Sequence, residues 1–221
     1  MLVLAHRGAN RQAPENTVAA MARAVELGAD GVELDVHRTA DGHLVVRHDA
    51  DTPAGPIGDL TRDQVATALP DVPTLGEVLD VCRGTLVNVE VKDPDPRAVD
   101  VLVGLLGTRA GLDDVLVSSF HLPTLDRVRE TAPELATGFL SFGLDPASAL
   151  AIAVDHGHSA VHPDVWSLAD PAALADRAHD RRLRVNVWTV NDPVQLRRLR
   201  DAGIDAVITD VPDLARDALR A

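Results

Sequence analysis

The chain has 221 residues, of which 46% are hydrophobic and 25% are charged, which is the balance of a soluble globular protein. Aromatic residues make up only 2% of the chain and Tyr is absent, so the core has to be built from aliphatic side chains. The formal net charge is −13, with 21 Lys and Arg against 34 Asp and Glu. Because an acidic surface does not neutralise a nucleic acid backbone, we expect no nucleic acid partner.

The single cysteine, Cys82, excludes an internal disulfide and any zinc site built from several cysteines. It falls in a helical pattern and is expected to be a buried, small hydrophobic side chain. The N-terminus carries neither the basic region nor the apolar run of a signal peptide. No stretch approaches the roughly 18 to 20 apolar residues of a membrane span. We therefore expect a cytoplasmic protein with no stable membrane anchor.

Short apolar runs alternate with longer helical patterns along the whole chain. The predicted strands are Leu2–Ala5, Gly31–Val36, Leu86–Val91, Val115–Ser119, Ala136–Leu140, Ala160–His162, Arg184–Thr189 and Ala206–Thr209. The predicted helices are Thr17–Leu27, Leu75–Cys82, Val99–Leu106, Pro123–Thr131, Ala147–His156, Ala172–Arg181, Val194–Ala202 and Asp213–Leu219. Asp41-Gly42 predicts a hairpin turn between Val36–Arg38 and His43–Arg47. The stretch Ala50–Thr61, rich in Pro, Gly and Asp, is expected to be a loop.

Eight strands, most of them followed by a helix, predict parallel strands joined by right-handed crossovers. In a chain of this length the pattern is typical of an α/β fold of the (β/α)₈ TIM barrel type, forming a single domain over residues 1–221. An open doubly wound sheet is the alternative. A short irregular insertion, about residues 37–71, follows the second strand. The barrel is favoured because polar side chains gather at the carboxyl ends of the strands, where barrel enzymes carry their chemistry.

The first polar cluster is His6-Arg7-Gly8, directly after the first strand. An imidazole at this place would project into the mouth of the barrel, and the planar guanidinium of Arg7 suits phosphate or carboxylate oxygens. Gly8 allows the backbone to turn tightly. The alternative is that His6 merely ends the strand and Arg7 pairs with an acidic neighbour. The segment taken by itself does not decide between the two.

The second cluster lies on the next two strands. Glu33 and Asp35 are two residues apart and point to the same face of their strand, as do Glu90 and Lys92 on the following one. Carboxylates that share a buried face repel each other, and a divalent cation, Mg²⁺ or Ca²⁺, would be held by such hard oxygen ligands. The alternative is a Glu90–Lys92 salt bridge beside a solvated face, but parallel sheets are covered on both sides. The oxygen-rich ligand set argues against zinc.

The third cluster is His48-Asp49, at the end of the predicted hairpin. The hairpin ties His48 to the strand that carries Asp35, so His48 and His6 can reach the same mouth. Two imidazoles beside a metal ion suit general acid and base catalysis near neutral pH. Taken alone, His48 is equally well a surface residue at the start of a loop.

The other histidines are weaker candidates. His162 ends a predicted strand and could line the pocket, because barrel enzymes use that end of the strands. The remaining ones fall in loops, a turn or helix ends, and most of them are expected on the surface: His37, His43, His121, His156, His158 and His179.

These clusters belong to a longer ordered set of motifs. The set comprises His6-Arg7-Gly8, Pro14-Glu15-Asn16-Thr17, Gly28-Ala29-Asp30, Glu33-Leu34-Asp35-Val36, Thr39, Asp41-Gly42, His48-Asp49, Pro73-Thr74-Leu75, Glu77-Val78-Leu79, Glu90-Val91-Lys92, Ser118-Ser119-Phe120, Trp188-Thr189-Val190-Asn191, Gly203-Ile204-Asp205 and Thr209-Asp210-Val211-Pro212. In order and spacing it resembles the glycerophosphodiester phosphodiesterase family, over nearly the whole chain. The barrel fold of that family agrees with the strand count.

The resemblance implies a metal-dependent phosphodiesterase. Its substrate would be a small molecule, a glycerophosphodiester, from which it would release glycerol 3-phosphate and an alcohol. His6 and His48 would be the general acid and base, and the divalent cation would be held by Glu33, Asp35 and Glu90. The attacking group would be either water or the 2-hydroxyl of the glycerol, which would give a cyclic phosphate that water then opens.

The same resemblance implies roles for further side chains. Arg7 and Lys92 would bind the phosphate, and Trp188 would wall the pocket against the glycerol moiety. Glu15 would support the site, either by orienting the first histidine or by reaching the metal shell. The family often carries a longer insertion that covers the pocket, whereas the segment at residues 50–59 is short here. The short segment would leave the alcohol side of the pocket more open.

Two other functions remain as alternatives. A related enzyme acting on a lipid, of the lysophospholipase D or sphingomyelinase D-like type, would use the same residues. It would need an exposed apolar rim or a membrane anchor, and the sequence indicates neither. A non-catalytic barrel that keeps a metal only for stability is disfavoured by the two histidines and the phosphate-binding cations.

Overall fold

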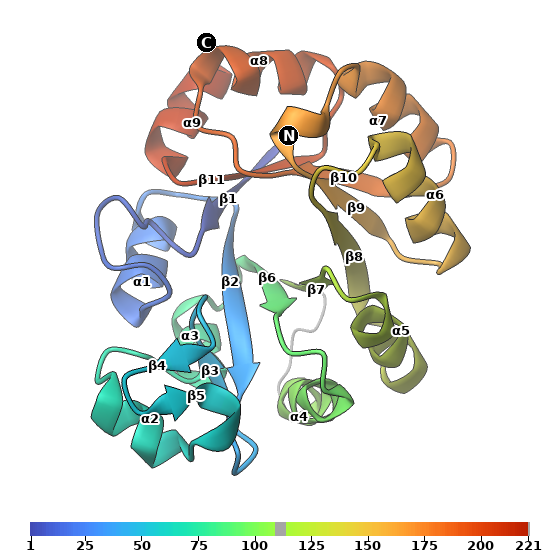
Figure 1. The fold of residues 1–221 in the computed structure, drawn as a ribbon. Coiled ribbons are helices and arrows are strands. Elements are labelled where there is room, and N and C mark those ends of the chain that lie inside the picture. The colour runs from blue at the N-terminus through green and yellow to red at the C-terminus, as the bar shows by residue number, and fades with distance from the viewer. Residues whose placement is uncertain (109–113, 221) are drawn as a thin grey trace.

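The computed structural model describes residues 1–108 and 114–220 and shows a closed barrel of parallel strands (Figure 1). Its strands are β1 Leu2–His6, β2 Gly31–Arg38, β6 Leu86–Val91, β7 Val115–Ser119, β8 Ala136–Ser141, β9 Ala160–Pro163, β10 Arg184–Val187 and β11 Ala206–Thr209. They follow one another around the wall in this order, and β1 pairs with both β2 and β11, which closes the sheet. The predicted (β/α)₈ barrel is confirmed, and the open doubly wound sheet is excluded.

Helices surround the barrel on the outside (Figure 1). They are α1 Val18–Glu26, α3 Leu75–Val81, α4 Pro96–Gly107, α5 Leu122–Thr131, α6 Pro146–Asp155, α7 Pro171–His179, α8 Pro193–Asp201 and α9 Pro212–Arg220. Each buries one apolar stripe, as Ala20, Met21 and Ala24 do on α1, because an amphipathic helix is held mainly by the face that it packs against the sheet. Thr17 is the N-cap of α1, and its hydroxyl accepts from the backbone N–H of Ala20.

Several helices begin earlier than the hydrophobic pattern predicts. α4, α6, α7 and α8 each start with an Asp N-cap followed by a proline: Asp95-Pro96, Asp145-Pro146, Asp170-Pro171 and Asp192-Pro193. A proline at the first helical position loses nothing, because its missing N–H has no partner there, and its fixed φ suits the helix. The Asp side chain accepts from the free amides of the first turn. The predicted boundaries leave these prolines outside the helices.

The insertion after β2 is more regular than predicted. It contains β3 Leu44–Val46, β4 Asp51–Thr52, β5 Gly55–Pro56, the 3₁₀ turn η1 Ile57–Asp59 and α2 Arg62–Ala68. β3 runs antiparallel to β2, which confirms the predicted hairpin. The stretch Ala50–Thr61 is therefore not a plain loop, because two short strands and a 3₁₀ turn lie in it. Helix α2 is missing from the prediction, although Thr61 and Gln64 form a capping box that marks its start.

The register of the strands decides which polar side chains meet. His6 at the end of β1 lies opposite Glu33 on β2, and Asp35 lies opposite Glu90 on β6. The space between wall and helices is filled mainly by Val, Leu and Ala, as the composition predicts, and Cys82 is buried in it. Burial raises the pKa of the Cys82 thiol to about 12, so this cysteine is an inert part of the core. Among the described helices, none is long and apolar enough to span a membrane.

Candidate active site

The carboxyl ends of the strands open into a cavity of about 200 Å³. The described residues that line it are His6, Arg7, Glu33, His48, Asn88, Glu90, Lys92, Phe120, Leu140, Trp188 and Ile208. The fold thus brings together side chains from the first, second and third polar clusters of the sequence, together with Trp188. These residues come from positions far apart in the chain, and they meet because parallel strands present their carboxyl ends at one face of a barrel.

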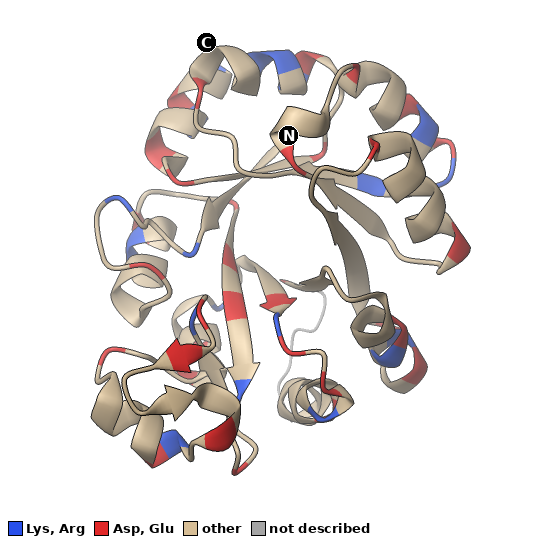
Figure 2. Ribbon diagram, viewed as in Figure 1, with Lys and Arg blue, Asp and Glu red and all other residues tan. Residues whose placement is uncertain are grey.

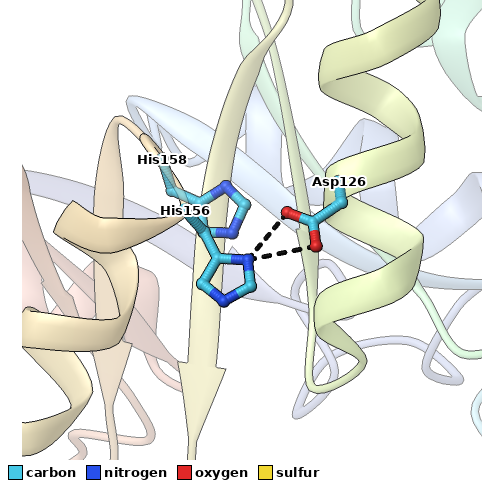
Figure 3. A group of neighbouring side chains, drawn as sticks. All are labelled: Asp126, His156 and His158. Atoms are coloured by element: carbon cyan, nitrogen blue, oxygen red, sulfur yellow. Dashed lines mark hydrogen bonds and ion pairs between the residues drawn. The ribbon is translucent and has the colours of Figure 1, made fainter.

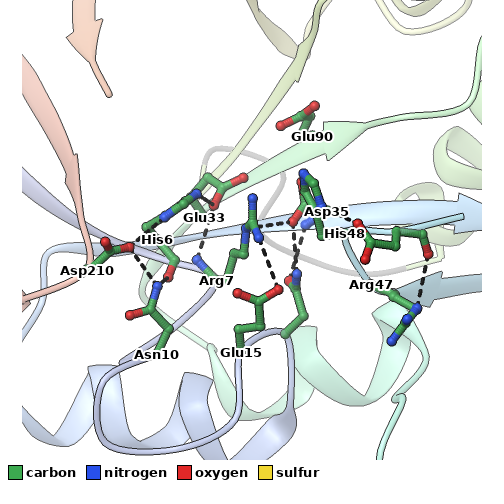
Figure 4. A network of polar contacts seen from close by, with 12 residues as sticks. His6, Arg7, Asn10, Glu15, Glu33, Asp35, Arg47, His48, Glu90 and Asp210 are labelled. Atoms are coloured by element: carbon green, nitrogen blue, oxygen red, sulfur yellow. Dashed lines mark hydrogen bonds and ion pairs between the residues drawn. The ribbon is translucent and has the colours of Figure 1, made fainter. Parts of the chain in front are cut away.

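Three buried carboxylates lie close together at this face of the barrel, and two of them, Glu33 and Glu90, line the cavity (Figure 4). Glu33, Asp35 and Glu90 each offer an oxygen within 4.8 Å of the others. Two cations lie against them: Arg7 Nε is 3.2 Å and Lys92 Nζ is 3.5 Å from Asp35, and Lys92 Nζ is 2.9 Å from Glu90. The Glu90–Lys92 salt bridge expected as the alternative to a metal site is present. It does not account for the other two carboxylates, which lie on a buried face.

The electrostatics of the cluster are unbalanced. Burial raises the pKa of Glu33 well above its usual value, and the neighbouring charges of Asp35 and Glu90 raise it further. Burial and the Asp35 charge also raise the pKa of Glu90, to about 7. At Asp35 burial acts in the same direction, but the charges of Arg7 and Lys92 outweigh it and hold the pKa below its usual value. Arg7 and Lys92 therefore keep Asp35 charged, whereas the contacts of Glu33 and Glu90 with the same cations do not offset the cost of their burial.

The residues present fit a divalent cation. Asn88 is fully buried and lines the cavity, and neither polar atom of its side chain has a hydrogen-bond partner among residues 1–108 and 114–220. A buried amide without partners is costly, and a bound group or its water would satisfy it. The nearby donors are carboxylate oxygens, which are hard ligands of the kind that Mg²⁺ and Ca²⁺ take. The sequence analysis missed Asn88, although it shares its strand face with Glu90.

His6 is held by a carboxylate that the sequence analysis did not assign to the site. Its Nδ1 donates to Asp210 Oδ1 at 2.7 Å, and its Nε2 lies 4.0 Å from Glu33 (Figure 4). Burial raises the pKa of Asp210, but hydrogen bonds from His6, Asn10 and Asn191 outweigh this and hold it well below the usual value. Asp210 is thus an anion that fixes the ring of His6 and leaves Nε2 free. The sequence signal for Asp210 is its place in the Thr209-Asp210 motif, directly after the last strand.

His48 has a similar arrangement. Its Nδ1 donates to Asp49 Oδ1 at 2.7 Å. The backbone carbonyl of His48 accepts a hydrogen bond from Nε2 of His37 at 3.0 Å, which holds this part of the chain to β2. In Figure 4 the Arg7 side chain lies between the two imidazoles of His6 and His48. Each ring therefore has a carboxylate at Nδ1, and both border the same cavity.

The turn after β1 places Arg7 over the carboxylates. Gly8 has φ +80° and a Cβ there would lie 2.6 Å from the carbonyl carbon of Ala20, so the turn requires glycine, as expected. Arg7 donates its backbone N–H to Glu33 and its Nη1 lies 3.0 Å from Glu15. Glu15 is half exposed and does not belong to the described lining of the cavity. Its contact with the site runs through Arg7, neither to His6 nor to the carboxylate cluster.

Three histidines are buried, namely His162, His37 and His158. His162 is fully buried below the cavity and is not among the described residues that line it. Its Nε2 accepts from Asn186 Nδ2 at 2.9 Å, and burial lowers its pKa to about 3. His37 and His158 are also buried, and they are the exceptions among six histidines of which the sequence analysis expects most on the surface. The other four are exposed: His43, His121, His156 and His179. His37 belongs to strand β2 and not to a loop, and His158 contacts Thr137 of strand β8 through its ring.

An exposed aromatic rim, Phe120, Phe142 and Trp166, follows strands β7, β8 and β9 at the face that carries the cavity, contrary to expectation. Phe120 is 38%, Phe142 71% and Trp166 83% exposed. The rings of Phe120 and Phe142 lie 5.7 and 6.1 Å from that of Trp188. Trp166 belongs to the 3₁₀ turn η3, Val165–Ser167, whose first residue donates its N–H to the Trp188 carbonyl at 2.7 Å. The sequence holds three Phe and two Trp, and four of these five side chains gather here.

Comparison with known proteins identifies relatives of this site. The sequence pattern of the glycerophosphoryl diester phosphodiesterase family matches residues 6–214. The chain is 32% identical to a glycerophosphodiester phosphodiesterase of Caldanaerobacter subterraneus subsp. tengcongensis, over 99% of this chain and 98% of that protein. A glycerophosphodiester phosphodiesterase of Bacillus subtilis is 30% identical, over 97% of this chain and 85% of that protein.

A solved structure shows the same fold with a ligand. The phosphodiesterase of Oleispira antarctica in complex with the product sn-glycerol-3-phosphate superposes with a TM-score of 0.88 at 26% identity, over 100% of this chain and 97% of that one. The family pattern matches nearly the whole barrel, and the alignments with the relatives cover nearly the whole of both chains. The chain belongs to the glycerophosphoryl diester phosphodiesterase family and is a phosphoric diester hydrolase that acts on glycerophosphodiesters.

Proposed function

We propose that the cavity hydrolyses glycerophosphodiesters to glycerol 3-phosphate and an alcohol by metal-dependent general acid–base catalysis. The observation that carries the proposal is the arrangement of two imidazoles, each with a carboxylate on Nδ1, around three buried carboxylates. The bound product of the Oleispira antarctica relative supports glycerol 3-phosphate as the product here. The substrate is a small molecule, in keeping with the size of the cavity.

The cation would be held by Glu33, Asp35 and Glu90, and Mg²⁺ or Ca²⁺ suits these oxygens. When bound, it supplies positive charge for the non-bridging oxygens of the phosphodiester. With the carboxylates engaged by the cation, Arg7 and Lys92 can turn from Asp35 to the phosphate, where their charges stabilise the transition state. The cation would therefore supply the positive charge that the carboxylate cluster lacks, and it would release Arg7 and Lys92 for the phosphate.

The two histidines would move protons at Nε2. Asp210 and Asp49 hold Nδ1 of His6 and His48 as a donor, so Nε2 of each ring is the atom that can accept or give a proton. One imidazole takes the proton of the attacking hydroxyl, and the other protonates the leaving alkoxide. Trp188 walls the cavity on the side of the glycerol moiety. Glu15 acts as a positioning residue, because it holds the guanidinium of Arg7.

The test measures release of glycerol 3-phosphate from glycerophosphocholine by the full chain with Mg²⁺ or Ca²⁺. Chelation by EDTA should abolish turnover, and added cation should restore it. His6→Ala and His48→Ala should each lower kcat by about 10²- to 10⁴-fold. His43→Ala is the matched control, because His43 lies in the same hairpin as His48, is exposed, and has only a 3.9 Å contact with Asp41. Full turnover in either catalytic variant, or after chelation, would overturn the proposal.

A second candidate substrate is a lipid with the same phosphodiester, such as a lysophospholipid. The exposed rim of Phe120, Phe142 and Trp166 favours it, because large apolar side chains exposed at one face of a protein are typical of a binding surface. An acyl chain leaving the cavity would pass over these rings. The expected absence of such a rim was the main argument against this substrate.

Comparison of lysophosphatidylcholine with glycerophosphocholine decides between the two substrates. If lipids are the preferred substrate, kcat/KM is higher for lysophosphatidylcholine, and Phe142→Ser and Trp166→Ser lower it for the lipid alone. Equal losses on both substrates, or a higher kcat/KM for glycerophosphocholine in the unmodified chain, would rule the lipid out and leave the first proposal intact.

A further inference from the structure

Two histidines and an aspartate gather at the other end of the barrel (Figure 3). Asp126 lies on α5, His156 is the C-cap residue of α6, and His158 precedes β9. One ligand atom from each residue lies within 4.8 Å of the others. Because His158 comes before its strand and the catalytic cavity lies after the strand ends, this cluster is separate from the active site.

His158 has a ring nitrogen without a partner. The residue is only 3% exposed, and its Nδ1 lies 3.1 Å from Thr137 Oγ1. Its Nε2 is buried and has no hydrogen-bond partner in the described part of the chain. In Figure 3 the ring nitrogens of His158 lie on the side that faces Asp126 and His156. A buried polar atom without a partner is costly, and such an atom aimed into a cluster of donors indicates a missing ligand.

The protonation state of His158 suits a ligand role. Burial lowers its pKa to about 4, so the ring is neutral near pH 7. If Nδ1 donates its hydrogen to Thr137, the lone pair stands on Nε2. Metal-bound histidines are oriented in this way, by a hydrogen bond from the ring nitrogen that does not ligate.

The other two residues complete a mixed donor set. His156 Nδ1 lies 2.9 and 3.0 Å from the two oxygens of Asp126. The rings of His156 and His158 are stacked, with centroids 5.8 Å apart and an angle of 17° between the planes. Gly157 between them has φ +69°, which allows both rings to turn to the same side. His156 is exposed, so an ion has access from solvent.

We propose that Asp126, His156 and His158 form a second cation site, which takes a divalent transition ion such as Zn²⁺. Two imidazole nitrogens and one carboxylate oxygen are a donor set that zinc takes, whereas the oxygen cluster of the catalytic cavity suits Mg²⁺ or Ca²⁺. Zinc–ligand distances of about 2.0 to 2.2 Å require the three donors to move somewhat closer than they stand here. The exposed side chains of Asp126 and His156 can make that movement.

The ion would tie helix α5 to the turn between α6 and β9. Its role is structural, because a ligand that binds only the folded chain raises the stability of that state. The guanidinium of Arg129 opposes binding, since it lies 2.8 Å from the Cβ position of Gly157 and lowers the pKa of His158. The sequence analysis overlooked the His156-Gly157-His158 pattern when it argued against zinc.

The test counts Zn²⁺ bound by the metal-stripped full chain, by calorimetry in excess Mg²⁺, and follows Tm with and without Zn²⁺. His156→Ala and Asp126→Asn change exposed side chains and should each weaken binding at this site at least about tenfold, with loss of the zinc-dependent rise in Tm. His179→Ala is the matched control, because His179 is an exposed histidine with a single carboxylate partner, Asp205 at 2.9 Å. It should bind Zn²⁺ as the unmodified chain does.

The inference is overturned if the unmodified chain, His156→Ala and Asp126→Asn bind the same number of Zn²⁺ ions with equal affinity. It is also overturned if Zn²⁺ raises the Tm of all three equally. His158→Gln should behave like the other two variants, and the exposed residues keep the test decisive if that buried change prevents folding. Mg²⁺-dependent turnover of glycerophosphocholine should be unchanged in His156→Ala, so the result does not depend on the proposed catalytic function.

Discussion

The two halves of the barrel wall treat buried polar groups in opposite ways. Strands β2 and β6 carry the buried acidic residues Glu33, Asp35 and Glu90, and Figure 2 shows acidic residues on these strands, whereas β8 carries none. Strands β9 and β10 instead bury His162 and Asn186, which bond to each other. The side chains of both sets are buried, but strands β2 and β6 bury acidic groups whereas strands β9 and β10 bury neutral ones.

The difference teaches what burial does when counter-charges are present or absent. Burial disfavours every charged form, and His162 responds by losing its proton. Asp35 keeps its charge because Arg7 and Lys92 lie within 3.5 Å. Glu33 has less compensation, and burial together with the charges of Asp35 and Glu90 raises its pKa well above the usual value. The carboxylates whose charge is not offset lie in the half of the wall that borders the proposed catalytic cavity. Buried titratable groups with strongly shifted pKa values are typical of functional sites.

The largest expected effect comes from removing one charge of the acidic half. Glu33→Gln should lower turnover of glycerophosphocholine by about 10²- to 10³-fold, because a ligand of the proposed cation is weakened. The Tm of the metal-free protein should rise or stay the same, because one of three mutually repelling carboxylates is gone. Steady-state kinetics and thermal unfolding without metal check both parts.

Asp164→Asn is the contrasting variant, just after β9, at a carboxylate that several backbone amides compensate. This buried carboxylate accepts from the backbone amides of Gly143, Trp166 and Ser167, so its loss should destabilise the fold by about 1 to 3 kcal/mol. If the Tm of Glu33→Gln falls as far as that of Asp164→Asn, the carboxylates of the acidic half do not destabilise the metal-free fold, and the comparison is wrong.

A smaller loss is expected at the carboxylate that orients His6. Asp210→Asn should lower kcat by about 10²-fold with little change in KM, because the ring of His6 loses the anion that fixes it. Asp213→Asn is the control, since Asp213 lies three residues further on and contacts the exposed Gln12. A kcat equal to that of the control, or a loss carried by KM alone, would show that Asp210 does not position the catalytic imidazole.

The smallest effect on turnover, and the clearest on stability, is expected for His162→Gln. In the folded chain the pKa of His162 is about 3, against 6.5 for an ordinary histidine. Between these values the unfolded chain binds a proton that the folded chain does not, so the free energy of unfolding decreases as pH falls. The slope from this one group is about 1.4 kcal/mol per pH unit.

Urea unfolding of the unmodified chain and of His162→Gln, from about pH 7 to about pH 5, measures that slope. The variant should lose about 1 to 3 kcal/mol at neutral pH, because Asn186 loses its partner, and its stability should depend less on pH. Parallel pH profiles for the two proteins would show that His162 is protonated in the folded state.

Much of the site was predictable because its residues sit at strand ends in local patterns. His6 ends an apolar run, Glu33 and Glu90 alternate with apolar residues in their strands, and the parallel register brings these positions together. Burial of His37 and His158 was not predictable, because it depends on elements that pack over them from elsewhere in the chain. The early helix starts at Asp-Pro pairs were predictable in principle from capping chemistry.

The aromatic rim shows the limit of local reasoning. Phe120, Phe142 and Trp166 stand in three separate loops, and nothing in their local sequence indicates that they share one surface. Their meeting depends on the parallel pairing of β7, β8 and β9, which carries the loops after these strands to one face. The same holds for the contact between His6 and Asp210, which joins the first and last strands of the wall.

The sequence by itself determined the alternation of strands and helices and the residue types that carry the chemistry. Both can be read from short segments: the elements from the period of the hydrophobic residues, and the chemistry from the polar residues at or near strand ends. Only the tertiary structure decided which carboxylate orients each imidazole, which histidines lose contact with water, and that two histidines meet Asp126 far from the catalytic cavity. These outcomes depend on distances between segments remote in the chain, and packing alone sets those distances.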